Sequence, residues 1–192
     1  MRLLSHDDPL PLEHPRRFAV AGPAGAGKST LAERLCGPLG VPFTQFESFY
    51  HAPGWTVRET WRQDVLAFVA GPVWAIEWQG EEVREELTAR TRVLVWLDHP
   101  RALTVGRTVV RTVRRRLGGG TPIPGGNVEG PLRTFFTDPD HIVREAWRRH
   151  PTVRAGVRRL ISEDRHPDLV VVRLRGQRQV REWVRGPFTA AV

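Results

Sequence analysis

The feature that most constrains the fold of this chain is a glycine-rich segment, Gly22–Ser29, which reads Gly-Pro-Ala-Gly-Ala-Gly-Lys-Ser. A short apolar run, Arg17–Ala21, precedes it, and apolar residues at helical spacing follow it. A Gly-x4-Gly-Lys-Ser pattern between a strand and a helix is the signature of a loop whose backbone holds phosphate groups. We therefore predict an α/β protein, and we call Gly22–Ser29 the phosphate loop. A glycine-rich turn without a ligand is the alternative.

The residue types of the phosphate loop suit phosphate binding. Its glycines lack a Cβ, so backbone N–H groups can converge on phosphate oxygens. The helix that begins near Lys28 adds its partial positive charge, and the Lys28 ammonium can span the β- and γ-phosphates. Ser29 supplies a hydroxyl ligand for Mg²⁺, and Thr30 is the adjacent candidate for the α-phosphate. The predicted nucleotide-binding residues here are Gly22, Gly25, Ala26, Gly27, Lys28, Ser29 and Thr30.

The composition agrees with an anionic ligand. The formal net charge is +8, and Lys28 is the only lysine among 29 basic side chains, the rest being arginines. This balance suits nucleotides, phosphorylated substrates or nucleic acid, although arginines on solvated faces would give the same count. A single cysteine, Cys36, excludes an internal disulfide and a multi-cysteine metal site. No apolar run reaches the ~18 residues of a membrane span, and Asp7 and Asp8 interrupt any secretory signal, so we expect a cytoplasmic protein without a membrane partner.

Strands and helices are expected to alternate along the chain. Strands are expected at 17–21, 41–46, 73–76, 92–97 and 169–174. Helices are expected near 28–36, 58–70, 81–90, 101–117, 139–149, 151–163 and 177–184, with an aromatic loop at 48–57. The alternation predicts a doubly wound parallel five-stranded sheet in one domain, 16–192, after an irregular proline-rich arm, 1–15. The glycine- and proline-rich stretch 118–131 is expected to be a flexible flap.

Three acidic residues come at the ends of expected strands, where function gathers in a parallel sheet. Glu77 is the first choice for Mg²⁺, which a carboxylate can hold through its water shell. Asp98 could do the same, or it could cap the helix that begins near residue 101. Glu47 could orient or deprotonate an acceptor hydroxyl, or it could be a loop acid that faces water.

Arginines recur at helical spacing at the base of the expected flap. Arg107, Arg111 and Arg114 share one stripe of the helix at 101–117, opposite a stripe of valines. They could stabilise the charge of a transferred phosphoryl group when the flap closes. A solvated helix face and a patch for nucleic acid are the alternatives. The flap favours catalysis, because a cover that excludes water limits hydrolysis of the phosphate donor.

From about residue 17 to 185, the chain resembles adenylate-kinase-like P-loop proteins of the topology modulation protein (FlaR-related) and AAA-family ATPase group. The resemblance lies in the phosphate loop, in Ala-Pro-Gly-Trp at 52–55, in Trp-Ala-Ile-Glu at 74–77, in Val-Trp-Leu-Asp-x-Pro-Arg at 95–101 and in Leu-Arg-Gly at 174–176. It implies a P-loop nucleoside-kinase fold with strand order 2-3-1-4-5 and a small lid at about 117–135. It also implies ATP on the phosphate loop, an acceptor near 44–61, Arg107 and Arg111 near the transferred phosphate, and Arg175 near the adenine.

Two segments depart from the pattern of that group. Phe46-Glu47 stands where the group has Leu-Asp, and Glu77-Trp78-Gln79 stands where it has Asp-Gly-Asn. Both changes keep a carboxylate but lengthen its side chain by one methylene, and Trp78 would fill space where an acceptor sits. The leading expectation is a Mg-ATP-dependent kinase that moves the γ-phosphoryl group to a nucleotide or another small acceptor. A nucleic-acid-associated ATPase or regulator, for which no reader motif is visible, and a nucleotide-binding switch are the alternatives.

Overall fold

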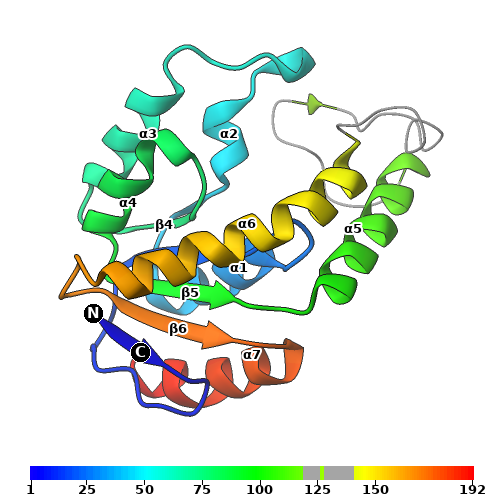
Figure 1. Cartoon of the computed structure of the whole chain (residues 1–192). Coiled ribbons are helices and arrows are strands. Elements are labelled where there is room, and N and C mark those ends of the chain that lie inside the picture. The colour runs from blue at the N-terminus through cyan, green and yellow to red at the C-terminus, as the bar shows by residue number, and fades with distance from the viewer. Residues whose placement is uncertain (119–125, 128–140) are drawn as a thin grey trace.

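The computed structural model describes residues 1–118, 126–127 and 141–192 of the chain (Figure 1). Most of the expected flap (118–131) and of the expected lid (117–135) lies outside the described residues.

A single parallel sheet organises the molecule. Its strands are β1 (Arg2–Leu4), β2 (Arg17–Ala21), β3 (Phe43–Thr44), β4 (Trp74–Glu77), β5 (Val93–Leu97) and β6 (Val170–Leu174). They lie in the order β1-β6-β5-β2-β4-β3, and every neighbouring pair is parallel. The doubly wound α/β class is confirmed, and the five expected strands keep their relative order.

The expected number of strands is wrong, because the sheet has six. The additional strand, β1, falls in the segment that was expected to be irregular. Its backbone pairs with the edge of β6, and the Arg2 N–H donates to the Leu169 carbonyl at 2.9 Å. The terminal ammonium of Met1 also lies 2.9 Å from Asp164. A three-residue strand held mainly by its backbone leaves no period in the sequence.

Helices cover both faces of the sheet (Figure 1). They are α1 (Lys28–Leu39), α2 (Phe46–Tyr50), α3 (Trp61–Ala70), α4 (Arg84–Arg90), α5 (Arg101–Arg116), α6 (Ile142–Glu163) and α7 (Gln177–Trp183). Short 3-10 turns occur at Pro53–Trp55 (η1) and Glu81–Val83 (η2), and a π-helical turn occurs at Val184–Phe188 (η5). No helix among the described residues is both long and apolar enough to cross a membrane.

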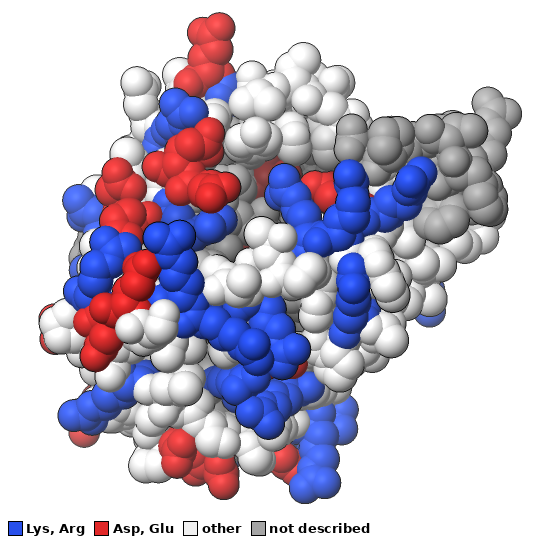
Figure 2. All heavy atoms as spheres, viewed as in Figure 1, with Lys and Arg blue, Asp and Glu red and all other residues white. Residues whose placement is uncertain are grey.

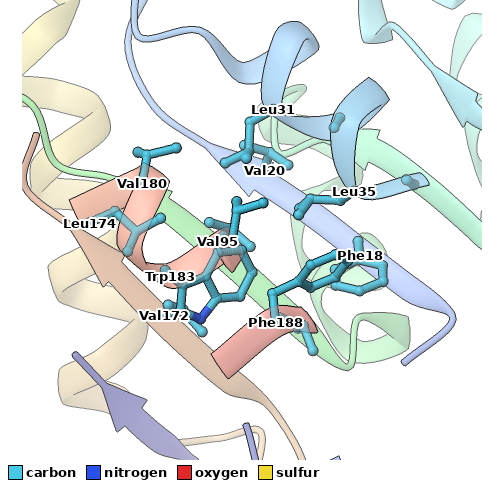
Figure 3. Close-up of a cluster of buried hydrophobic side chains, with 14 of the residues drawn as sticks. Phe18, Val20, Leu31, Leu35, Val95, Val172, Leu174, Val180, Trp183 and Phe188 are labelled. Atoms are coloured by element: carbon cyan, nitrogen blue, oxygen red, sulfur yellow. The ribbon is translucent and has the colours of Figure 1, made fainter. Parts of the chain in front are cut away.

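Two hydrophobic cores form, one on each face of the sheet. Phe18 and Val20 of β2 face α1 and α7, where they join Leu35, Trp183 and Phe188 (Figure 3). The alternate residues of β2 face the other core, which α3, α4 and α6 complete. We call these the α1/α7 core and the α3/α6 core. Strands buried on both faces explain the continuous apolar runs in the sequence.

The two helices expected at 139–149 and 151–163 form one continuous helix, α6, with Pro151 inside it. A proline within a helix leaves the carbonyl of the residue four positions earlier without its N–H donor. That carbonyl belongs to Trp147, and the Arg101 guanidinium donates a hydrogen bond to it. Arg101 also stacks over the Trp147 ring at 3.8 Å. The helix therefore continues because a side chain from α5 replaces the missing donor.

The strand expected at 41–46 is shorter than predicted, because Phe46 begins α2 instead. The Phe46 ring is buried and packs edge-on against Trp61 at 5.8 Å. It also lies against the backbone at Gly80, which has φ +73°, and a Cβ there would come within 2.5 Å of the ring. The chain turns into α2 at this point to seat the ring, so part of the expected aromatic loop is helical.

Candidate active site

The phosphate loop leaves β2 at the carboxyl edge of the sheet and enters α1 at Lys28. Gly27 precedes the helix with φ 92°, in the left-handed region that favours glycine. Gly25 has φ 76° and packs against α5, where a Cβ would lie 2.1 Å from the Thr104 carbonyl oxygen. The glycines thus fix the path of the loop and set it directly against α5.

Lys28 and Ser29 end the phosphate loop and are the first two residues of α1. The Lys28 Nζ donates to the carbonyl of Pro23 at 3.4 Å, so its side chain folds back over the loop. The Ser29 hydroxyl donates to Glu77 Oε1 at 2.7 Å. The second oxygen of Glu77 accepts a hydrogen bond from Gln79 Nε2 at 3.2 Å. The structure therefore brings together Ser29 and Glu77, the two residues predicted to hold Mg²⁺.

The strand register explains how Glu77 reaches the loop. Strand β4 lies beside β2, with Val20 opposite Glu77. Glu77 is only 5% exposed, and its two carboxylate oxygens are held by Ser29 and Gln79. One hydroxyl and one carboxylate suit Mg²⁺, which keeps several waters and takes its other ligands from phosphate oxygens. The described residues contain no group of three acidic, histidine or cysteine side chains that would form a protein-only metal site.

Asp98 takes part in an ion cluster. Arg173 Nε donates to its carboxylate at 2.8 Å, and Arg154 Nε lies 2.9 Å from its other oxygen. The interpretation of Asp98 as a helix cap is wrong, since Pro100 occupies that position and no side chain caps α5. Two guanidinium groups balance its charge, and the cluster ties α6 to β6 instead.

Helix α5 turns two different faces to its surroundings. Thr104, Thr108 and Thr112 are buried, and the first two lie against Gly25 of the phosphate loop. The valines at 105, 109 and 113, which lie opposite the arginine stripe, are half-buried or exposed. The buried threonines satisfy their hydroxyls within the helix, since Thr104 donates to the Arg101 carbonyl and Thr108 to the Thr104 carbonyl, each at 3.0 Å.

The arginine stripe of α5 lines a hollow of about 530 Å³. Its lining residues are Ala102, Leu103, Gly106, Arg107, Val110, Arg111 and Arg114. The Arg107 guanidinium donates to Gln177 Oε1 of α7 at 3.1 Å, which joins α5 to the loop after β6. Arg175 belongs to that loop, where its backbone N–H donates to Gln179 Oε1 at 2.7 Å. The hollow has the size of a small-ligand site and a cationic wall.

A buried histidine lies next to this wall. His99 is 1% exposed, and among the described residues neither of its ring nitrogens has a hydrogen-bond partner. Burial, and next the positive charge of Arg107, lower the pKa of His99. Nε2 of His150 on α6 lies 3.0 Å from the His99 carbonyl oxygen. Because a carbonyl oxygen only accepts, this nitrogen donates the hydrogen bond.

Glu47 lies on α2, beyond the end of β3. Its carboxylate is 2.8 Å from His51 Nδ1, one helical turn further along. The following turn is held by Asn127, whose side chain accepts from the Trp55 N–H at 3.0 Å and donates to the Ala52 carbonyl at 3.2 Å. Residues far apart in the sequence therefore meet around the segment expected to hold the acceptor.

Trp78 does not project into open space at this edge. Its ring is 6% exposed, and its Nε1 donates to the Thr88 hydroxyl at 2.9 Å. The Arg84 guanidinium stacks over it at 4.9 Å, and a Cβ on Gly156 of α6 would touch it at 3.8 Å. Trp78 thus belongs to the α3/α6 core, which explains how the chain accommodates tryptophan there.

Sequence reasoning missed several residues of this region. They are His51, His99, Asn127, Arg154, Arg173 and Gln177. Each has a partner distant in sequence or one turn away, and no local motif marks it. The spacing of Glu47 and His51, four residues apart across the end of α2, is the one signal that could have been found.

Among solved structures, the chain is similar to a gluconokinase from Sinorhizobium meliloti 1021, with 15% identity, a TM-score of 0.51, and coverage of 93% of this chain and 95% of that chain. A shikimate kinase from Aquifex aeolicus matches at 14% identity and TM-score 0.46, over 91% of this chain and 94% of that one. A sugar kinase from Janibacter sp. HTCC2649 matches at 18% identity and TM-score 0.44, over 93% and 98%. No protein-family model and no curated protein matched. The first likeness shows that the chain shares an α/β P-loop kinase fold.

Proposed function

We propose that the protein is an ATP-dependent kinase that transfers the γ-phosphoryl group to a small acceptor. The observation that carries this proposal is the 2.7 Å hydrogen bond between Ser29 and Glu77, directly after Lys28 in the phosphate loop. This pair supplies the hydroxyl and the carboxylate that a Mg-nucleotide requires beside a phosphate-binding loop. The shared fold with a gluconokinase supports the same reading.

Each part of the site has a role in this reaction. The N–H groups of the phosphate loop and the Lys28 ammonium bind the β- and γ-phosphates, and Ser29 and Glu77 hold Mg²⁺. When bound, Mg²⁺ neutralises charge on the phosphate oxygens. Arg107 and Arg111 line the hollow along α5, the helix that packs against Gly25, and stabilise the charge that develops on the transferred group. Arg175 borders the nucleotide base, in the loop that Gln177 joins to Arg107.

The acceptor binds on the other side of Glu77, near α2 and the η1 turn. Glu47 orients the acceptor there. The solved protein of similar fold is named for gluconate, which is a small hydroxylated acid, and this agrees with a small-molecule acceptor. Nucleotide acceptors remain part of the proposal until a panel of substrates separates the classes.

Turnover tests the proposal directly. ADP release is measured with ATP, Mg²⁺ and panels of sugars, hydroxy acids and nucleoside monophosphates, for wild type, Lys28→Ala and Arg34→Ala. Lys28→Ala should lose acceptor-dependent release by about 10²-fold or more, because a charge on the transferred phosphate is no longer stabilised. Arg34 lies exposed on α1, so its variant should match the wild type. If no acceptor in the panels increases the rate of ADP release in any of the three proteins, the protein is not a kinase for these acceptors.

A further inference from the structure

We propose that His51, aligned by Glu47, removes the proton from an acceptor hydroxyl, so that the acceptor is an alcohol rather than a phosphate. This inference rests on the kinase function proposed above. It concerns the pair that Glu47 of α2 forms with His51, the residue that follows α2, and it gives His51 a role that no sequence motif indicates.

The hydrogen bond within the pair fixes which nitrogen of the ring can act. Glu47 Oε2 lies 2.8 Å from His51 Nδ1. An ionised carboxylate only accepts hydrogen bonds, so Nδ1 carries the hydrogen and donates it. In the neutral ring the lone pair is therefore on Nε2. Within the described residues, Nε2 of His51 has no partner that competes for this lone pair.

The ring is held in place on several sides. Tyr50 and Trp55 meet it edge-on, with centroids at 4.8 and 5.2 Å. A backbone bridge pairs His51 with Val57, and the side chain of His51 is 20% exposed. An imidazole with a fixed direction and one open nitrogen is the arrangement that a general base requires.

The sheet places the start of α2 at the same carboxyl edge as the phosphate loop. Thr44 of β3 lies opposite Ile76 of β4, so the chain leaves β3 beside Glu77. Phe46 anchors α2 against the backbone at Gly80, just after the Glu77–Gln79 segment. The start of α2, with Glu47, thus lies at the same carboxyl edge of the sheet that carries Lys28 and Ser29, and His51 follows one turn later.

The chemistry of the acceptor decides whether such a base is needed. A phosphate acceptor already carries negative oxygens near neutral pH, so it can attack without losing a proton. An alcohol holds its proton, and a positioned base contributes about 10²–10⁴-fold to the rate. In the proposed step, the hydroxyl proton passes to His51 Nε2 and the acceptor oxygen bonds to the γ-phosphorus. The bond from that phosphorus to the β–γ bridging oxygen breaks, and ADP leaves.

The test compares His51→Gln, Glu47→Gln and wild type, with His6→Gln as a matched control. His6 also faces a carboxylate, with Nε2 3.2 Å from Glu182, and its side chain is 24% exposed. It lies near β1, and β1 is at the opposite edge of the sheet from β3. ADP release is measured with polyols and hydroxy acids and, separately, with nucleoside monophosphates. ATP affinity is measured by calorimetry.

We expect turnover with alcohols and not with monophosphates. His51→Gln should lower kcat by about 10²-fold or more with less than threefold change in ATP affinity. Glu47→Gln should lower kcat less, and His6→Gln should match the wild type. Added imidazole should restore part of the activity of His51→Ala, which a purely structural role would not allow. Nitrogen-15 spectra of the wild type should show His51 protonated on Nδ1.

Four results would overturn the inference. If kcat of His51→Gln stays within threefold of wild type, His51 is not the general base. If the neutral ring carries its proton on Nε2 alone, His51 cannot accept the hydroxyl proton there. Neither result contradicts the kinase function. Phosphorylation of monophosphates but not alcohols also leaves the kinase and refutes the acceptor class. Absence of acceptor-dependent turnover with every class removes the kinase function itself, and this inference with it.

Discussion

Gly25 is the residue of the phosphate loop with the least freedom to change. Its φ of 76° and the nearby Thr104 carbonyl leave no space for a Cβ. Gly25→Ala should therefore lower the free energy of unfolding by about 2 kcal/mol or more, through backbone strain and a forced shift of α5. Urea denaturation measures the change.

Gly37 provides the matched control. It lies inside α1, has no positive φ, and an added Cβ would meet nothing within 4 Å beyond its chain neighbours and its own helix. Gly37→Ala should change the free energy of unfolding by less than about 1 kcal/mol, because the better helix propensity of alanine is offset by contact of its Cβ with Pro38. Equal effects of the two substitutions would contradict the contact between the loop and α5.

His99 should make stability depend on pH. Burial and the charge of Arg107 lower its pKa below the ordinary 6.5 in the folded protein. As the pH falls below about 6.5, the unfolded chain takes up a proton that the folded chain resists, so stability is lost. The contribution of His99 to stability is complete above about pH 6.5 and disappears as the pH falls toward the pKa of His99 in the folded protein.

Unfolding curves between pH 7 and pH 5 test this dependence. The free energy of unfolding should fall more steeply with acid in the wild type than in His99→Gln. The other histidines are the same in both proteins, so the difference between the two curves reports on His99. Parallel curves would show that the His99 ring is accessible to protons in the folded state.

Among the elements, α6 shows what local sequence rules omit. The rules correctly predict a helix on either side of Pro151, and they place a break between the two. The Arg101 guanidinium prevents the break by donating to the Trp147 carbonyl. That contact spans two helices, and nothing in the sequence around Pro151 indicates it. Helix α5, in contrast, ends within one residue of its predicted limit because its basic last turn and following glycines are local signals.

A double-mutant cycle tests the role of Arg101. Arg101→Met should lower the free energy of unfolding by about 1–2 kcal/mol, because the Trp147 carbonyl loses its donor. Pro151→Ala restores a backbone N–H at the proline position, so the same Arg101→Met change should cost less in that background. Identical costs in both backgrounds would mean that Arg101 stabilises α6 only by stacking on Trp147.

At the scale of the whole molecule, the sequence predicts the sheet better than the site. Apolar runs that alternate with helical patterns predict a parallel sheet, whereas the order of five of its strands followed from the family resemblance. Strand β1 was not, since it depends on backbone pairing with β6. At the site, Ser29 and Glu77 meet as predicted, because each belongs to a strand end or a loop motif.

The charge of the molecule is also distributed unevenly. Arginines gather along α6 on the face shown in Figure 2. Some of them are paired, as Arg154 is with Asp98 and Arg159 is with Glu163. A basic surface beside the site suits the attraction of an anionic nucleotide. Nucleic-acid binding stays the alternative prediction, and it would appear as DNA binding with a steep dependence on salt.

The central claim is that the phosphate loop binds Mg-ATP, and labelling of amines tests it most directly. Lys28 is the only lysine, so an amine reagent can modify only Lys28 and the N-terminus. The N-terminal ammonium pairs with Asp164 near β1 and serves as an internal control. Mg-ATP should slow the labelling of Lys28 and leave that of the N-terminus unchanged. Equal labelling of Lys28 with and without Mg-ATP would contradict the claim.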